Sequence, residues 1–171
     1  SRIEAEIEKQ TKSAIEAPSG KIAGEMMAKV NLLLQLYPAP NKDIQRAKLE
    51  QLSTTVVSAS RRIEDIRRLR YNEWAITRIQ GSLKAYRDAL KVKHVVAVAK
   101  WCRPDREALI SNCATWMSPI DPMFLEPSAM DLYNYVFGLT RDSMGDDEES
   151  RIRLTQSFVS SRNIRKTPAD F

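Results

Sequence analysis

The chain has 171 residues, of which 43% are hydrophobic and 29% are charged, and its formal net charge is +5. This balance indicates a folded protein with one substantial core or two small ones, and it excludes wholesale disorder. A content of only 5 glycines argues against an all-β design, and no apolar run approaches the length that a membrane span needs.

The first forty residues predict a pair of helices separated by a break. Acidic residues occupy the first turns of the opening helix, where they complement the helix dipole. Pro18-Ser19-Gly20 interrupts the helical pattern, and Pro38 and Pro40 end the second helix at a tight corner. The second helix has a broad apolar face, which comprises Ile22, Met26, Met27, Val30, Leu33, Leu34 and Tyr37.

A third, long helix is expected over roughly residues 43 to 92, with Asp43 as its N-cap. Its first seam has the a/d spacing of a coiled coil and consists of Leu49, Leu52, Val56, Ala59, Ile63 and Ile66. The next positions in that register are Arg70 and Glu73, which we do not expect to act as apolar knobs. The repeat is therefore expected to restart on a second surface, with Leu69, Ile76, Leu83 and Leu90 as one row and Ile79 and Tyr86 as the other.

Shorter helices are predicted for the rest of the chain. The valine-rich residues 92–98 are assigned to the end of the long helix because no partner strand is evident, and Pro104 is expected to open a further helix. The proline-punctuated segment 118–127 is predicted to be a loop, followed by a helix capped at Ser128. The last helix is expected to begin with the acidic residues 146–149 and to end at the basic residues Arg162, Arg165 and Lys166.

These elements predict an all-α fold in two parts. Residues 1–92 are expected to form an elongated helical hairpin or three-helix coiled coil, and residues 103–171 a small compact helical bundle. The apolar seams of the long helix are the predicted interface for oligomerisation or docking. The interface candidates are Leu49, Leu52, Val56, Ile63, Ile66, Leu69, Ile76 and Leu83.

Basic residues gather where the first seam ends, in the middle third of the chain. A positive stretch with interleaved aromatic rings is typical of backbone-directed nucleic-acid binding. The candidates for such contacts are Arg61, Arg62, Arg67, Arg68, Arg70, Trp74, Lys84, Arg87, Lys91 and Lys93. A purely structural interpretation is equally open, in which the arginines pair with Glu64 and Asp65 on a solvated helix face. Arg62 and Arg67 occupy g and e positions, so a parallel self-pairing of this stretch is disfavoured.

Catalytic and metal-binding patterns are missing from the sequence. His94 is the single histidine, which excludes a multi-histidine metal site. Cys102 and Cys113 form no C-x-x-C pair and no disulfide framework, so we expect an intracellular, reducing compartment. The acidic run 146–149 lacks the ligand spacing of a calcium loop. We therefore predict no catalytic residue, no metal and no cofactor, and we expect the chain not to be an enzyme.

The leading functional hypothesis is a non-enzymatic structural or assembly protein, which forms a homo-oligomer or binds a helical protein partner. The alternative is a nucleic-acid-binding module centred on residues 61–106. A third hypothesis is an adaptor that presents the Met26–Tyr37 helix to a groove on another protein. A membrane and a small-molecule substrate are not expected among the partners. Because the sequence starts with Ser1, a fragment or processed product is expected.

Overall fold

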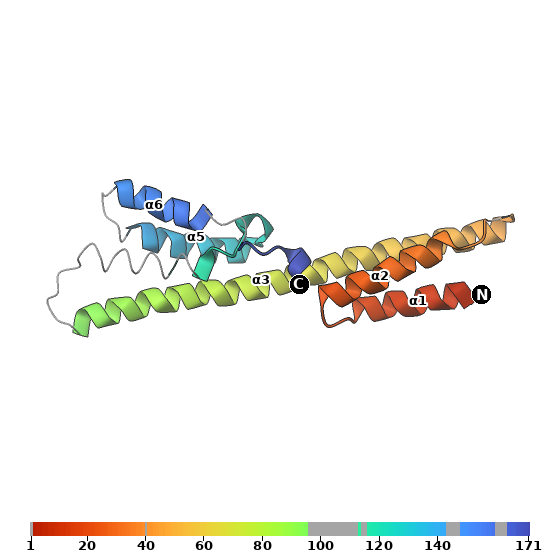
Figure 1. The fold of residues 1–171 in the computed structure, drawn as a ribbon, viewed down its shortest axis with the longest axis horizontal. Helices are drawn as coiled ribbons and strands as arrows, with labels where there is room; N and C mark the ends of the chain where they lie inside the picture. The colour runs from red at the N-terminus through yellow and green to blue at the C-terminus, as the bar shows by residue number, and fades with distance from the viewer. Residues whose placement is uncertain (1, 40, 96–112, 114–115, 143–147, 160–163) are drawn as a thin grey trace. The chain divides into compact units, whose positions relative to one another are not determined.

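The computed structural model describes residues 2–39, 41–95, 113, 116–142, 148–159 and 164–171. Within these ranges the chain is all-α, as predicted, and no β-strand occurs. The helices are α1 (Arg2–Ile15), α2 (Gly20–Gln35), α3 (Asp43–Val95), α5 (Pro127–Asp142) and α6 (Glu148–Val159), with short 3-10 helices η1 (Pro122–Phe124) and η2 (Pro168–Asp170) (Figure 1). The helix expected to start at Pro104 lies largely outside the described residues.

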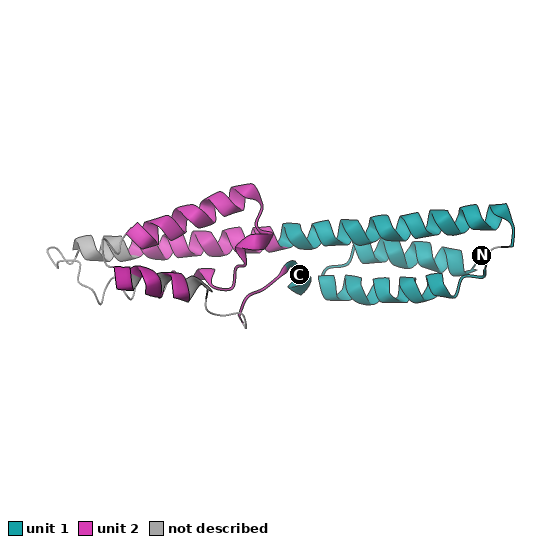
Figure 2. Ribbon diagram, turned by 90° about the horizontal axis from the view of Figure 1, so that it is seen from above, with its two compact units in different colours: residues 1–70, 168–171 teal, residues 71–167 magenta. Residues whose placement is uncertain are grey.

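The chain divides into two compact units, and α3 contributes to both. Unit 1 contains residues 1–70 and 168–171, whereas unit 2 contains residues 71–167 (Figure 2). The division therefore falls inside α3, between Arg70 and Tyr71, and not near residue 92 where the sequence suggested it. It coincides with the end of the first apolar seam.

Unit 1 is built from α1, α2 and the first part of α3, which lie side by side (Figures 1 and 2). Its core joins apolar side chains from all three helices: Ile7, Ala14, Ala17, Ala23, Met27, Val30, Leu52, Val56, Ala59 and Ile63 are buried. The first seam predicted on α3 thus faces α1 and α2 of the same chain. Ser19 caps α2, because its Oγ accepts a hydrogen bond from the Ile22 N–H at 3.3 Å.

Unit 2 has its own core, which uses a different set of α3 residues. Buried Ala75 and Ile79 of α3 pack with Met117, Ile120, Tyr133 and Val136. Ile79 of the predicted second repeat is therefore buried. However, the predicted restart of that repeat at Leu69 is wrong, because the Leu69 side chain is 52% exposed. The first fully buried residue after the arginines is Tyr71, and Asn72 beside it is 2% exposed.

The predicted end of the last helix also requires correction. Helix α6 is described from Glu148 to Val159. Arg165 and Lys166 do not belong to a helix, and Arg162 is outside the described residues. Lys166 forms an isolated parallel bridge with Ile120, and its N–H donates to the Pro119 carbonyl at 2.9 Å. This tertiary pairing outweighs the helix-dipole preference on which the prediction rested, since such a preference is worth only about 0.3–1 kcal/mol.

The seam of unit 1 provides a test of this packing. Replacement of Leu52, which is 2% exposed, by Ala leaves a cavity in the core, so we expect a loss of about 2–5 kcal/mol in the free energy of unfolding. Chemical denaturation monitored by far-UV circular dichroism measures the change. The matched variant Leu32→Ala, at a side chain that is 60% exposed, is expected to change stability by less than about 0.5 kcal/mol. Equal effects of the two variants would contradict the assignment of the core.

Candidate functional site

The arginines at the end of the first seam are divided between internal and solvent-facing roles. Arg67 donates to the Gly20 carbonyl, and Arg70 donates to the carbonyls of Ala17 at 3.0 Å and Phe171 at 3.3 Å. Both side chains are half-buried. Charge-assisted bonds of this kind are stronger than neutral ones. Arg67 and Arg70 therefore hold unit 1 together, and Arg70 fills the seam position that we expected an arginine to be unable to fill.

Gly20 lies at the centre of these contacts. Its N–H donates to the Phe171 carbonyl at 2.6 Å, so the last residues of the chain cover the first turn of α2. A Cβ at this position would lie 2.5 Å from the carbonyl carbon of Phe171. Only glycine permits such a close approach. The break at residues 18–20 is therefore a packing site as well as a turn.

Trp74 is half-buried in unit 2. It packs against the core of unit 2, with its ring centroid 5.3 Å from that of Tyr71. Cations cover the indole ring, since Arg78 lies 5.7 Å and Lys166 lies 5.6 Å from its centroid. The pattern of arginine and aromatic residues that suggested nucleic-acid contacts thus includes, in Trp74, a partly buried residue that packs against the core of unit 2.

The other basic candidates have a different environment. The side chains of Arg61, Arg62, Arg68, Lys84 and Arg87 are exposed. Lys91 and Lys93 belong to α3, but their side chains are outside the described part of the structure. The structure therefore leaves exposed basic residues on α3 in both units, whereas Arg67, Arg70 and Trp74 take part in packing.

Sequence reasoning missed the role of Tyr71 and Asn72. The Asp121 N–H donates to the Tyr71 hydroxyl at 2.7 Å. Asn72 donates to the Phe124 carbonyl at 3.1 Å and accepts from the Glu126 N–H at 2.8 Å. These contacts satisfy the backbone of the proline-punctuated loop. The sequence shows only that Asn72 follows Tyr71, and helical periodicity does not reveal that both side chains bind this loop.

The predicted interface residues are mostly inside the chain's own cores. Leu52, Val56 and Ile63 are between 2% and 7% exposed. Leu49, Ile66, Ile76 and Leu83 are half-buried, and only Leu69 is exposed. Leu52 is enclosed in the core of unit 1, and Val56 and Ile63 expose only small parts of their side chains. Any docking surface on the folded chain must therefore rely mainly on other, more exposed side chains.

Unit 1 presents such a surface between α2 and α3. A groove of about 510 Å³ runs between the two helices. Its lining residues are Ala23, Gly24, Met27 and Asn31 of α2, and Val56, Val57, Ser60, Arg61, Ile63, Glu64 and Arg67 of α3. The apolar part includes Val57, whose side chain is 52% exposed. An apolar floor with charged residues along one wall is typical of a helix-binding groove.

The charges of this groove lie on its α3 wall. Arg61 and Glu64 are both exposed, and neither forms an ion pair within the described ranges. Pairing of Arg61 or Arg62 with Glu64 and Asp65, the structural alternative for the arginines, is likewise not observed in this part of the chain. A second cation of this wall, Arg67, donates to the Gly20 carbonyl. Arg61 and Glu64, a single helical turn apart, are therefore the exposed charged residues of the groove.

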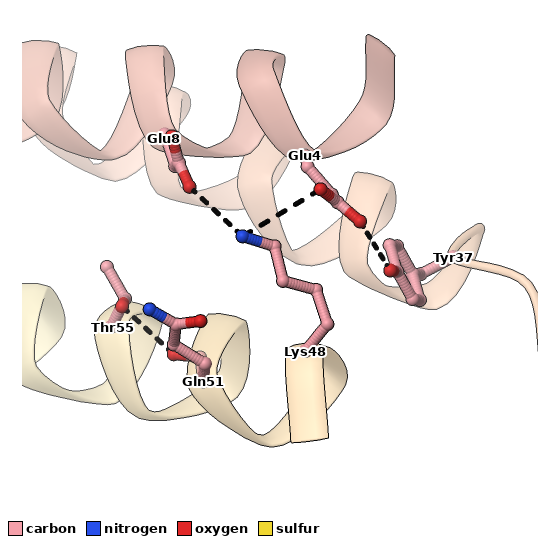
Figure 3. A network of polar contacts seen from close by, with 6 residues as sticks. All are labelled: Glu4, Glu8, Tyr37, Lys48, Gln51 and Thr55. Carbon is pink, nitrogen blue, oxygen red and sulfur yellow. Dashed lines mark hydrogen bonds and ion pairs between the residues drawn. The ribbon is translucent and has the colours of Figure 1, made fainter. Parts of the chain in front are cut away.

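A polar network joins α1, α3 and the segment that follows α2 at another place in unit 1 (Figure 3). The Tyr37 hydroxyl donates to Glu4 at 2.6 Å, and the Lys48 ammonium lies 3.8 Å from Glu4 and 3.9 Å from Glu8 (Figure 3). The hydrogen bond from Tyr37, helped by the positive charge of Lys48, lowers the pKa of Glu4. The same bond and the negative charge of Glu4 raise the pKa of Tyr37.

The pKa of Glu4 is a direct reporter of this network. We expect Tyr37→Phe to raise that pKa toward its ordinary value, and Lys48→Met to raise it less, because the hydrogen bond is the larger cause. A carboxyl whose pKa is lowered in the folded state stabilises the fold above its unfolded pKa, and this contribution is lost as pH falls through the folded pKa. NMR titration of the side-chain carboxyl measures both variants. An unchanged Glu4 pKa in Tyr37→Phe would disprove the contact.

Arg70 is the second testable contact. Replacement by Met keeps much of the aliphatic length, but it removes the Arg70 donor from the Ala17 carbonyl and leaves the Phe171 carbonyl with the Gly20 N–H as its donor. We expect a loss of about 1–3 kcal/mol in unfolding free energy. Arg62→Met, at an exposed position of α3, is the matched control and should change stability by less than about 0.5 kcal/mol. A thermal or urea unfolding series distinguishes the two, and an equally harmless Arg70→Met would show that the contact is not structural.

Other kinds of site find no support in the described residues. Within them, no group of three or more His, Cys, Asp or Glu side chains is placed to hold a metal ion, and no helix is long and apolar enough to cross a membrane. Cys113 is a buried free thiol. Comparison with known proteins found no matching family model, no similar curated protein and no similar solved structure.

Proposed function

We propose that this chain is a non-enzymatic assembly protein that docks a helical surface in the α2–α3 groove of unit 1. The groove is the observation that supports this proposal, because it combines an apolar floor, the 52% exposed Val57 and the charged residues Arg61 and Glu64. We further propose that the protein acts inside the cell, in a reducing compartment, since a buried free thiol such as Cys113 needs no oxidising environment.

The packing of unit 1 narrows the ways in which such a protein can assemble. The a/d seam of α3 is buried against α1 and α2. A coiled coil with another chain along that seam would therefore require unit 1 to open. The groove needs no such opening. Its small α2 residues, Ala23 and Gly24, allow another helix to come close to the backbone. Docking there would bury Val57 without disturbing the core.

A photo-crosslinking amino acid in place of Val57 tests the proposal. In its native cell, the full chain labelled there should form a covalent adduct with another protein molecule, either a second copy or a different chain. Ser58, exposed on α3 and not part of the groove, is the matched control position and should give little adduct. Equal labelling from both positions, or none from either, would refute docking in the groove.

A second candidate function is backbone-directed nucleic-acid binding. It is favoured by the exposed side chains of Arg61, Arg62 and Arg68 on one segment of α3. Because Arg67 and Arg70 bind backbone carbonyls, the positive surface is smaller than the sequence alone suggested. Affinity that depends on phosphate contacts falls steeply as salt rises.

Two double variants test this second function. The α3 pair is Arg62→Glu/Arg68→Glu, and the matched α1 pair is Lys9→Glu/Lys12→Glu. Both variants change the net charge by the same amount at exposed positions. The α3 pair should weaken binding to a short oligonucleotide at least about tenfold and flatten the salt dependence, and the α1 pair should change it little. Fluorescence anisotropy at several salt concentrations is the measurement. Equal losses from both pairs, or salt-independent binding, would reject a dedicated site.

The adaptor hypothesis is the least supported. Met27 and Val30 belong to the core of unit 1, and Met26, Leu33, Leu34 and Tyr37 pack against it. The Met26–Tyr37 face could enter a groove on another protein only if α2 left its own unit. We therefore propose that α2 acts as one wall of a groove and not as a ligand for one.

A further inference from the structure

We infer that the α2–α3 groove receives the same face of a second copy of this chain, related by a two-fold axis that makes the paired α3 helices antiparallel. This inference rests on the proposed docking function and names its partner. It follows from the order of charges along the groove, from the room at Gly24 and from the exposure of Val57.

The charges on the α3 wall are complementary to themselves in this arrangement. Arg61 and Glu64 are exposed, face the same groove and form no ion pair within the described part of the chain. A two-fold axis that crosses α3 between them brings Arg61 of each copy beside Glu64 of the other. An isologous interface of this kind forms each contact twice. One cation and one anion therefore become two intermolecular ion pairs.

The parallel alternative lacks this complementarity. With α3 helices aligned in the same direction and register, Arg61 would approach Arg61 and Glu64 would approach Glu64 of the second copy. Like charges in such positions are destabilising. The antiparallel arrangement removes both repulsions, which is why the charge order selects the direction of pairing.

The α2 wall has the shape that such a neighbour requires. Gly24 is exposed, and a Cβ added there would contact only the end of the Arg67 side chain, at an ordinary distance of 3.5 Å. The packing of unit 1 therefore does not require glycine at this position, in contrast to Gly20. A glycine in the middle of a helix costs stability relative to alanine. Close approach of a second backbone at the groove gives this residue a physical role.

The pairing would also cover the exposed apolar part of the groove. Val57 is 52% exposed, beside Val56 and Met27 at the groove floor. In the two-fold arrangement, Val57 of each copy lies toward the end of the paired segment, with the ion pairs between the two valines. The contact therefore combines apolar burial with a charge pattern that sets register, a division of roles found at many specific interfaces.

Sedimentation equilibrium of the full chain over a wide concentration range tests the inference, with the variants Arg61→Glu, Glu64→Arg and the double exchange. The unmodified chain should form a reversible dimer. Each single change places like charges together and should weaken dimerisation at least about tenfold, and the double exchange should restore it. Arg62→Glu, an exposed residue that does not line the groove, is the control and should have little effect.

A steric variant makes the test independent of charge. A Cβ at position 24 meets only the end of the Arg67 side chain, and the longer side chain of Gly24→Leu would occupy the groove. This variant should therefore abolish the dimer while far-UV circular dichroism stays unchanged. A chain that is monomeric at every concentration, or a folded double exchange that fails to restore the dimer, would overturn the inference. If that monomer still crosslinks from position 57 to a different protein, the proposed docking function stands and only its partner was wrong. If neither occurs, both proposals fail.

Discussion

The structure depends on how α3 ends one buried seam and begins another. Unit 1 needs the face of α3 that carries Leu52, Val56 and Ile63, whereas unit 2 needs the face that carries Tyr71, Ala75 and Ile79. Position 70 lies between these two sets of residues. Arg70 donates hydrogen bonds to two backbone carbonyls. These carbonyls therefore have a donor at the point where the buried face of α3 changes.

Helical periodicity was sufficient to predict the fold class and the first seam. It did not predict that Arg67 and Arg70 bind backbone carbonyls inside unit 1. The spacing from Leu52 to Ile63 identifies the buried face because three helices bury it together. The same rule suggested that Arg70 must leave the core, since it treats guanidinium only as a charge. A guanidinium is also a set of hydrogen-bond donors. Its partners are carbonyls at Ala17 and Phe171, far away in the sequence, so a local pattern could not find them.

The errors at Leu69 and at the last helix have the same origin. A seven-residue count placed Leu69 on a seam, but the tertiary contacts of Tyr71 and Asn72 decide which face unit 2 covers. Likewise, the basic residues near the end of the chain suggested a helix terminus, whereas Lys166 pairs with Ile120 and lies over Trp74. In both cases a weak local preference was overridden by partners distant in sequence.

The α2–α3 groove could not be read from the sequence for a different reason. A groove is a property of the faces that remain uncovered after packing. Helical periodicity assigns no role to Val57 or Gly24. The packing of α1 against α2 and α3 is what shows that these two residues line the α2–α3 groove.

Unit 1 is discontinuous in the chain, since residues 168–171 return to it after the whole of unit 2. A chain leaving the ribosome therefore makes α1, α2 and the start of α3 long before Phe171 exists. During that interval the Gly20 N–H lacks its carbonyl acceptor and Arg70 lacks one of its two. Unit 1, which carries the groove, is thus completed only by the last described residues. It reaches its full stability only after unit 2 has been synthesised.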